Sequence, residues 1–310
     1  MILRANDEAR FESGSRSESD SGVVKYTLVV ATIGRRAELA ALLASLANQC
    51  FREFEVIVVD QNPEGFIDDV ISDYSSVLRI AHLRTNRRGA SLARNIGLET
   101  ARGQIVTFPD DDCEYPPDLL AKVDRALGQL PEFAGISVAS RDKQSVRRIV
   151  RFSGKAGELT KFNLLNRCVE FGIFLRRESL AKSRFDELMG VGAEHSSWWS
   201  DEGPDLLLSM MNEGMRIYYV PEILIFHPDP VFKFDGKAIR RSFMYGCGRG
   251  HYLRKHRYPL WYVIRVWGLY VVGAILGICQ LNPRKAKYYW SGLQGRIKGY
   301  VQKLPEIAQK

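Results

Sequence analysis

Two glycine-rich phosphate-binding motifs are missing from this sequence. No GxGxxG follows the first predicted strand, and GxxxxGK[S/T] occurs nowhere in the chain. The first absence argues against a dinucleotide-dependent dehydrogenase, and the second argues against a P-loop nucleotidase. If the protein binds phosphate, we therefore expect a metal ion and basic side chains to meet its charge, because no glycine loop is available.

Cysteine is scarce and shows no pairing pattern. The five cysteines are an odd number, and none of them forms a CxxC pair. This argues against a disulfide framework and a zinc site, and it indicates a reducing compartment. Residues 1–24 are rich in Ser, Glu, Asp and Arg and lack the apolar core of a secretory signal. We expect them to form a disordered leader.

Acidic residues are almost absent from the C-terminal quarter of the chain. The net charge is +8, and residues 236–310 contain fifteen Lys and Arg but only one acid, Glu306. The rest of the chain is therefore mildly acidic, which argues against a uniformly basic nucleic-acid-binding protein. We expect no nucleic-acid partner. The sequence predicts three segments: the leader 1–24, a main domain 25–235, and a basic, apolar helical region 236–310.

The main domain alternates between buried strands and amphipathic helices. Strands are predicted at 26–32, 54–60, 78–83, 104–108, 217–221 and 223–227, and helices at 37–48, 66–74 and 89–100. This alternation predicts an α/β fold with a mostly parallel sheet flanked by helices. Ligands bind such sheets at the carboxyl ends of the strands. Thr32, Asp60 and Asp110 stand at predicted strand ends, so we expect one crevice to collect them.

Three adjacent acids, Asp110, Asp111 and Asp112, follow the central predicted strand. Their mutual repulsion costs stability unless a cation is bound nearby. Asp110 and Asp112 are two residues apart, so an extended or turning backbone can point both side chains the same way. Mg²⁺ and Mn²⁺ take carboxylate oxygens together with phosphate oxygens. We therefore expect a Mg²⁺ or Mn²⁺ site here, with a solvated acidic turn as the alternative.

Four short motifs in a fixed order carry a resemblance to a known family. They are Val30-Ala31-Thr32, Val58-Val59-Asp60, Ala93-Arg94-Asn95-Ile96-Gly97 and Phe108-Pro109-Asp110-Asp111-Asp112. Together they resemble the nucleotide-sugar domain of family 2 glycosyltransferases, the GT-A fold, over roughly residues 25 to 230. The resemblance implies a nucleotide-diphosphate sugar as the donor and inversion at the anomeric carbon.

The resemblance also implies which residues bind the donor nucleotide. In this family the acid after the second strand holds the nucleobase, and that acid is Asp60 here. The Arg-Asn pair of the following helix lines the donor site, which places Arg94 and Asn95 there beside Thr32. Structural alternatives remain open, since Asp60 could cap a turn, Arg94 could be a helix-surface cation, and Asn95 could bond a loop backbone.

The metal and diphosphate positions follow from the same resemblance. The D-x-D of the family holds the ribose and the metal-bound diphosphate, which corresponds to Asp110 and Asp112 with Asp111 between them. A histidine after the last strand can complete the metal shell in this fold, which makes His227 a candidate ligand. The structural alternative is a surface or core histidine.

A second acidic group, running from Asp201 through Glu202 to Asp205, opens a predicted helix. Pro204 suits the first turn of a helix, and acids there are favoured by the helix dipole. The resemblance implies that a Glu-Asp-x-Asp-Leu motif supplies the general base at this point. Aligning on Asp205 places Glu202 at the Glu position and Gly203 where the family has Asp. We favour Glu202 as the base, with Asp201 and Asp205 as alternatives.

Residues 259–281 are apolar apart from Arg265 and Gln280, and basic residues flank both ends. This segment could form a helix that lies in the inner leaflet, or a single marginal membrane span. As a third hypothesis, the helix could pack on the main domain or in a dimer interface. We favour association with the cytoplasmic face of the plasma membrane through an apolar face and basic anchoring to anionic lipid.

The combined prediction is a membrane-associated, metal-dependent inverting glycosyltransferase acting on a polysaccharide or lipid-linked acceptor. One alternative is a nucleotidyltransferase, for whose glycine-rich loop the segment 33–36 is only a faint match. A second alternative is an inactive membrane-docking protein, which the departure at Gly203 keeps open. The sugar, the acceptor and the linkage depend on the shape of the 140–200 region.

Overall fold

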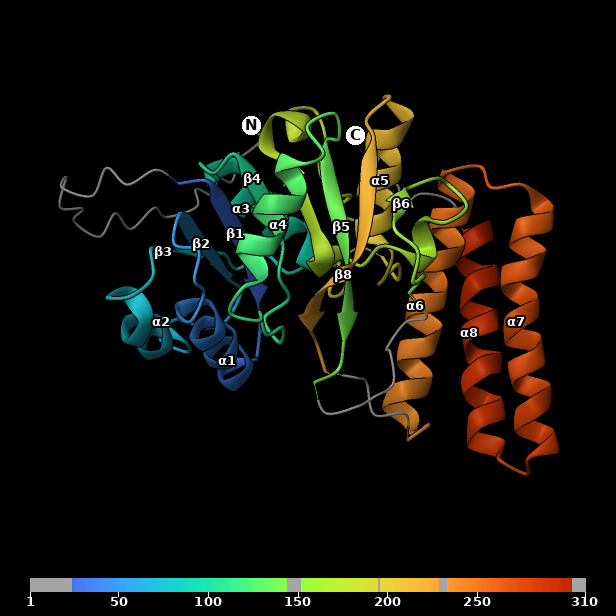
Figure 1. The fold of residues 1–310 in the computed structure, drawn as a ribbon. Coiled ribbons are helices and arrows are strands. Elements are labelled where there is room, and N and C mark those ends of the chain that lie inside the picture. The colour runs from blue at the N-terminus through green and yellow to red at the C-terminus, as the bar shows by residue number, and fades with distance from the viewer. Residues whose placement is uncertain (1–23, 144–151, 195, 229–232, 303–310) are drawn as a thin grey trace, which may run out of the picture.

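The computed structural model of the 310-residue chain describes residues 24–143, 152–194, 196–228 and 233–302. The predicted leader, residues 1–24, lies outside these ranges except for Val24. An eight-stranded sheet with the order β3-β2-β1-β4-β7-β5-β8-β6 forms the centre of the molecule (Figure 1). The strands are β1 Tyr26–Thr32, β2 Phe54–Asp60, β3 Ile80–Arg84, β4 Ile105–Thr107, β5 Gly135–Arg141, β6 Gly157–Glu158, β7 Ile173–Arg176 and β8 Ile217–Phe226.

The sheet is mixed, and its larger part is parallel. Strands β1 to β4 pair in parallel, as do β5 and β8, whereas β7 runs antiparallel to both β4 and β5. The predicted α/β sheet is therefore confirmed. The prediction of two closing strands was wrong, because β8 is a single strand. Its register against β5 jumps from Val220 to Leu224, and Pro221, which has no N–H to donate, lies in that irregularity.

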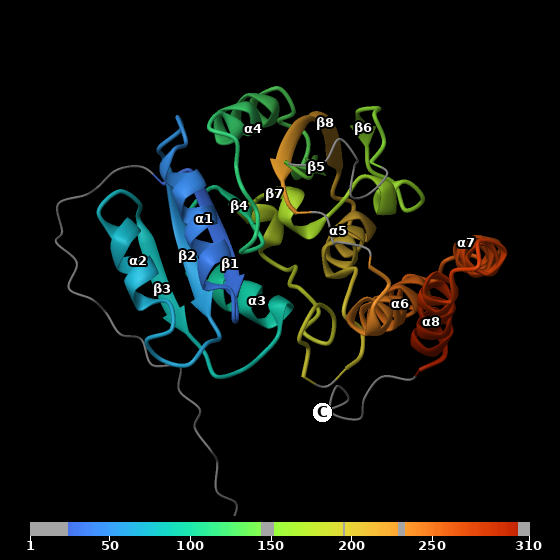
Figure 2. The same cartoon turned by 90° about the horizontal axis from the view of Figure 1, so that it is seen from below.

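Helices cover both faces of the sheet (Figure 2). They are α1 Arg36–Ala47, α2 Asp68–Ser75, α3 Ala90–Thr100, α4 Leu119–Gly128 and α5 Glu202–Asn212, with 3-10 turns η1 Leu164–Asn166, η2 Glu170–Gly172 and η3 Arg177–Leu180. Successive strand residues point to opposite faces, so β1 contributes to two cores. Leu28 and Val30 pack with α1, α2 and α4, whereas Val29 packs with α3 and α5.

Three C-terminal helices form a further layer beside the sheet (Figures 1 and 2). They are α6 Gly236–Lys255, α7 Leu260–Cys279 and α8 Pro283–Val301. Helices α6 and α8 pack backbone to backbone at glycines. A Cβ atom on Gly246 or Gly250 of α6, or on Gly295 or Gly299 of α8, would overlap the backbone of the other helix. Small residues at a helix crossing permit this close approach.

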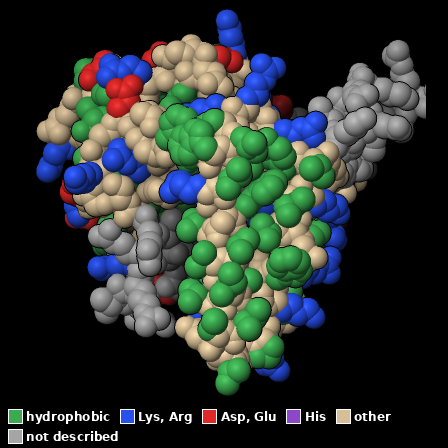
Figure 3. Space-filling model, turned by 90° about the vertical axis from the view of Figure 1, so that its right-hand side faces the viewer, with side chains coloured by type: hydrophobic (Ala, Val, Ile, Leu, Met, Phe, Trp, Pro, Cys, Tyr) green, Lys and Arg blue, Asp and Glu red, His purple; other side chains and the backbone are tan. Residues whose placement is uncertain are grey.

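The outer face of this layer is apolar (Figure 3). Leu269, Val272, Ile275 and Ile278 of α7 are each more than half exposed. Lys and Arg side chains lie along the margins of this face, and residues 236–302 contain no Asp or Glu. Helix α7 is long and apolar enough to cross a membrane by length and composition, with a mean hydropathy of 1.8. The layer thus combines an exposed apolar face with purely basic charge.

Partly buried ion pairs tie α6 to the start of α5. Arg249 donates from Nε and Nη2 to the two carboxylate oxygens of Asp201, at 2.6 and 2.8 Å. Asp205 accepts from Lys255 Nζ at 2.8 Å, and His256 Nε2 lies 2.8 Å from its other oxygen. Burial favours the neutral acid, but His256 and Lys255 outweigh it and hold the pKa of Asp205 below its usual value. The helical layer is therefore fixed to the sheet domain.

We expect Asp205→Asn to lower the free energy of unfolding by about 2–3 kcal/mol. Breaking a fully buried pair costs roughly 3–5 kcal/mol, and Lys255 keeps a second partner in Asp186 at 2.7 Å. The measurement is chemical denaturation. The pKa of Asp205 is lower in the folded protein than in the unfolded chain. The difference in unfolding free energy between wild type and variant should therefore be fully present above the unfolded pKa of about 3.9, and it should fade as the pH falls through the lower folded pKa.

Asp118→Asn is the matched control, since it breaks an exposed i,i+4 pair with Lys122. That variant should lose less than about 1 kcal/mol. Equal, small losses in both variants would show that the contact between α5 and α6 adds nothing to stability.

Candidate active site

A cavity of about 450 Å³ opens where β1 and β4 end. It is bounded by the loops after β1, β4 and β8 and by α3, η2, α5 and α6. Charged side chains dominate its wall. The carboxylates are Asp110, Asp111, Asp112, Glu170 and Glu202, and the arginines are Arg35, Arg88, Arg94 and Arg241. The cavity therefore offers both cation ligands and positive charge for an anionic substrate.

Backbone pairing places the acidic run beside the last strand. Asp110 extends the parallel pairing of β4 through a bridge to Ala31 of β1. Four residues later, Glu114 pairs antiparallel with Phe226 at the end of β8. This second bridge brings the next residue, His227, next to the acids.

Asp110, Asp112 and His227 form a set of possible metal ligands. His227 Nε2 lies 3.2 Å from Asp112 Oδ1 and 4.0 Å from Asp110 Oδ2, and one ligand atom from each residue lies within 4.8 Å of the others. His227 Nδ1 is 2.9 Å from the carbonyl oxygen of Pro228, to which it donates. That bond leaves Nε2 facing the acids, an arrangement typical of metal-binding histidines.

The spacing between His227 and Asp112 fits a cation. A lone pair on Nε2 opposite a carboxylate oxygen is repulsive unless a proton or a metal ion lies between them. Burial lowers the pKa of His227, but the charge and hydrogen bond of Asp112 outweigh burial and raise it. A divalent ion would replace that proton. The donor set of two carboxylates and one imidazole therefore fits Mg²⁺ or Mn²⁺.

Asp111, the middle acid, points away from this set. Its Oδ2 accepts from Thr32 Oγ1 and its Oδ1 from Arg35 Nη1, both at 2.9 Å. Burial raises the pKa of Asp111 to about 6, although Arg35 and Thr32 oppose the shift. Arg35 also bonds Asp112. Thr32 and Arg35 thus hold the acidic loop to β1, and Arg35 relieves part of the repulsion among the acids.

Arg94 connects the two acidic groups of the cavity. Its side chain is only 4% exposed, so it is not the helix-surface cation that the sequence left possible. Nη2 lies 2.7 Å from Asp110 Oδ1, and Nη1 lies 3.1 Å from Glu202 Oε1. Burial alone would lower the pKa of Arg94, but Asp110 and Glu202 outweigh it and keep the guanidinium charged.

Glu202 is the residue of the second acidic group that faces the cavity. It begins α5 and is 3% exposed. Burial raises its pKa, and the charge of Arg94 opposes this. Asp201 and Asp205 bond to α6 instead, as described above, and they do not line the cavity. Trp198, close before this group in the chain, lies fully buried against the ring of His251 and is not available to stack on a sugar.

Glu170 lines the same cavity and was not anticipated from the sequence. It begins η2, just before β7. Burial raises its pKa to about 8, and the charges of Glu202 and Asp110 add to the shift. No local pattern marks this glutamate, because packing between η2 and α5 brings it to the cavity.

Two residues expected at the donor site lie behind the cavity wall. Asn95 exchanges hydrogen bonds with the backbone N–H and C=O of Phe185, both at 3.0 Å. Asp60 is fully buried, accepts two bonds from Asn62, and lies 3.0 Å from His82 Nε2. These bonds outweigh burial and lower the pKa of Asp60. Their roles in donor binding stay predictions, and Gln61 lines the cavity next to Asp60.

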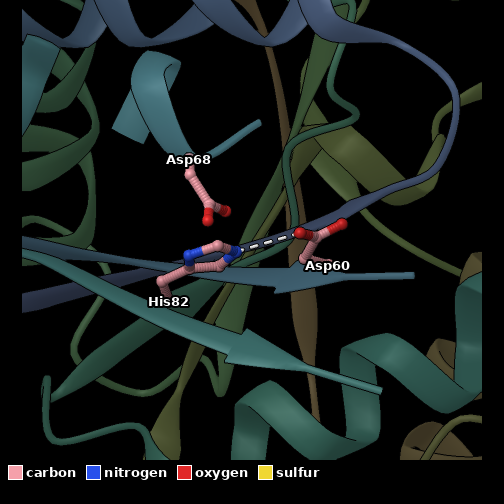
Figure 4. A group of neighbouring side chains, drawn as sticks. All are labelled: Asp60, Asp68 and His82. Carbon is pink, nitrogen blue, oxygen red and sulfur yellow. Dashed lines mark hydrogen bonds and ion pairs between the residues drawn. The ribbon is translucent and has the colours of Figure 1, made fainter. Parts of the chain in front are cut away.

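His82 lies between Asp60 and Asp68 (Figure 4). One ligand atom from each of the three lies within 4.8 Å of the others, so they are a second possible metal group. However, Asp68 already bonds Arg84 at 2.7 Å, and the oxygens of Asp60 are held as described above. Asp110 and Asp112 each keep one oxygen that no arginine holds, so the group with His227 is the better candidate for a metal.

Several known proteins are similar to this chain in sequence. A sequence model described as "Glycosyl transferase family 2" matches residues 27–184. An uncharacterized glycosyltransferase of Haemophilus influenzae is 35% identical over 105 residues, 34% of this chain and 35% of that protein. GalNAc(5)-diNAcBac-PP-undecaprenol beta-1,3-glucosyltransferase of Campylobacter jejuni is 27% identical over 185 residues, 56% of this chain and 58% of that protein. The matches thus span less than two thirds of either relative.

Solved structures share the fold. TarS of Staphylococcus aureus, residues 1–349, gives a TM-score of 0.57 with 14% identity, covering 89% of this chain and 91% of that one. The mannosyltransferase PcManGT of Pyrobaculum calidifontis, in complex with GDP-Man and Mn²⁺, gives 0.58 with 16% identity, covering 90% and 88%. The predicted GT-A-like fold is therefore confirmed.

We expect Asp112→Asn to weaken the binding of a nucleoside diphosphate in the presence of Mn²⁺ by at least about tenfold, because it replaces a charged ligand by a neutral amide. Calorimetric titration with UDP and GDP, with and without Mn²⁺, measures this. Asp69→Asn makes the same change at an exposed acid outside the cavity and should leave binding unchanged. Mn²⁺-dependent binding of equal strength in both variants would remove Asp112 from the metal site.

Proposed function

The chain belongs to glycosyltransferase family 2, and on that basis we propose that it transfers a sugar from a nucleotide-diphosphate donor to an acceptor hydroxyl with inversion at the anomeric carbon. The observation that carries this proposal is one cavity in which Arg94 joins a cation-binding set to the buried Glu202. Bound UDP, UDP-GlcNAc and GDP-Man in structures of the same fold support the donor class. Family membership sets aside the nucleotidyltransferase alternative.

A bound cation and arginines of the cavity wall would supply the positive charge that a diphosphate needs. Asp110, Asp112 and His227 would hold a divalent cation, which when bound stabilises negative charge on the leaving diphosphate. Arg88 and Arg241 line the same cavity and add positive charge without a glycine-rich loop. The sequence likewise predicted a metal and basic side chains in place of such a loop.

Glu202 is the proposed general base. It would take the proton of the acceptor hydroxyl as that oxygen bonds the anomeric carbon and the bond from this carbon to the diphosphate oxygen breaks. Asp201 and Asp205 are held by Arg249, Lys255 and His256 and are not free for this role. No protein nucleophile is required.

We expect Glu202→Gln to lower kcat by about 10²- to 10⁴-fold while the affinity for the nucleotide changes little, because the base acts on the acceptor and not on the donor. The assay follows nucleoside diphosphate release from a panel of nucleotide sugars with glycan and lipid-linked acceptors. Glu213→Gln, at the exposed end of the same helix, is the control. An active Glu202→Gln would assign the base elsewhere, and no release from any donor would favour the inactive docking protein.

The acceptor is proposed to be a polysaccharide or a lipid-linked glycan. The names of several relatives support this class, among them the poly(ribitol-phosphate) beta-N-acetylglucosaminyltransferase TarS and the undecaprenol-linked glucosyltransferase of Campylobacter jejuni. The match to TarS spans 29% of this chain and only 16% of TarS. A metal-dependent hexosyltransferase at the cytoplasmic face of the plasma membrane fits such an acceptor.

The C-terminal helices are proposed to rest on that membrane side-on. Helix α8 packs along α7 and carries exposed Arg284, Lys287 and Lys298. If α7 crossed the bilayer, α8 would follow, and its charges would enter the hydrocarbon at a large cost. Side-on docking instead buries the apolar face of α7 and leaves the basic side chains at anionic headgroups.

We expect Leu269→Glu with Val272→Glu to weaken binding to phosphatidylglycerol-containing vesicles several-fold in cosedimentation, because both exposed side chains would meet lipid. Val77→Glu is the matched control, since Val77 is 58% exposed on the sheet domain. Wild-type protein should bind neutral vesicles more weakly and leave membranes in alkaline carbonate. Retention in carbonate would instead show that α7 spans the bilayer.

A further inference from the structure

Glu170 is a carboxylate in the cavity to which the proposed reaction assigns no task. It reaches the cavity from η2, which lies between the acids after β4 and Glu202 in the chain. Among the described residues, no hydrogen bond or ion pair to its side chain is found. A buried glutamate without a partner is costly when ionised and takes up a proton instead, so the Glu170 carboxyl group is free to bond a group that enters the cavity.

The position of Glu170 is linked to Gly203. A Cβ atom on Gly203 would lie 2.8 Å from both the Cα and the Cβ of Glu170, closer than real contacts allow. The acidic run from Asp201 to Asp205 therefore has no room for a side chain at 203. The space beside Glu202 that such a side chain would fill is taken by Glu170.

The two glutamates differ in how they are held. Glu202 Oε1 is fixed by Arg94 at 3.1 Å, so its orientation is set by the guanidinium. The backbone of Glu170 packs against Gly203, the neighbour of Glu202, and the charge of Glu202 adds to burial in raising the pKa of Glu170. Arg94 supplies one positive charge to a region that also contains Asp110. The two carboxyl groups thus reach one cavity from neighbouring backbone, Glu202 from α5 and Glu170 from η2.

We propose that Glu170 is a second catalytic carboxylate, which contacts the acceptor hydroxyl together with Glu202 so that the two act as one proton-accepting pair. The inference rests on the proposed function. In the reaction, the acceptor oxygen loses its proton to the pair and bonds the anomeric carbon, while the diphosphate leaves with the electrons of the broken C–O bond. The pair then returns the proton to solvent.

The test compares Glu170→Gln with Glu202→Gln and with the double variant in the nucleoside diphosphate release assay. Glu170→Gln should lower kcat by about 10²-fold or more with donor KM nearly unchanged. The double variant should be within a few-fold of the slower single variant, because residues that act as a unit are not additive. Formate should restore part of the activity of Glu170→Ala. Glu178→Gln, an exposed glutamate of η3, is the control.

The outcomes separate this inference from the proposed function. Release by the unaltered chain supports the transferase, whatever the variants do. A kcat of Glu170→Gln within threefold of wild type would overturn the role of Glu170, as would multiplied losses in the double variant. A loss in Glu170→Gln accompanied by a lower melting temperature and no rescue by formate would mean that Glu170 only supports the packing at Gly203.

Discussion

The buried guanidinium of Arg94 is the contact on which the cavity depends. A buried charge is tolerated only when it is paired, and Arg94 is paired on two sides, with Asp110 after β4 and with Glu202 at the start of α5. Asp110 follows the next strand along the chain, whereas Glu202 lies 108 residues away. One side chain therefore fixes α3, the acidic loop and α5 relative to one another, and with them the distance between the cation set and the proposed base.

A second set of partly buried ion pairs extends this arrangement to the C-terminal layer. Asp201 and Asp205, which flank Glu202, hold Arg249, Lys255 and His256 at the end of α6. The same helix contributes Arg241 and Tyr245 to the cavity wall. If the outer face of α7 rests on a membrane, the cavity is held at a fixed place relative to the lipid surface, which suits a lipid-linked acceptor.

Sequence alone predicted what is local. The buried strands, the acids at the end of β4 and a histidine after β8 all follow from short patterns, and the structure brings Asp110, Asp112 and His227 together. What sequence could not predict depends on partners far along the chain. The acids at 201 and 205 suit a helix N-terminus, but their partners on α6 lie more than forty residues away. Glu170 reaches the cavity only through packing against Gly203.

Arg94 joins the proposed divalent-cation site to Glu202 within one cavity. A crystal structure with Mn²⁺ and a nucleoside diphosphate, with anomalous data at the manganese edge, tests it most directly. We expect an anomalous peak beside Asp110, Asp112 and His227, with Arg94 still bridging Asp110 and Glu202. A peak at Asp60, Asp68 and His82 instead, or Arg94 withdrawn from Glu202 once the nucleotide is bound, would contradict it.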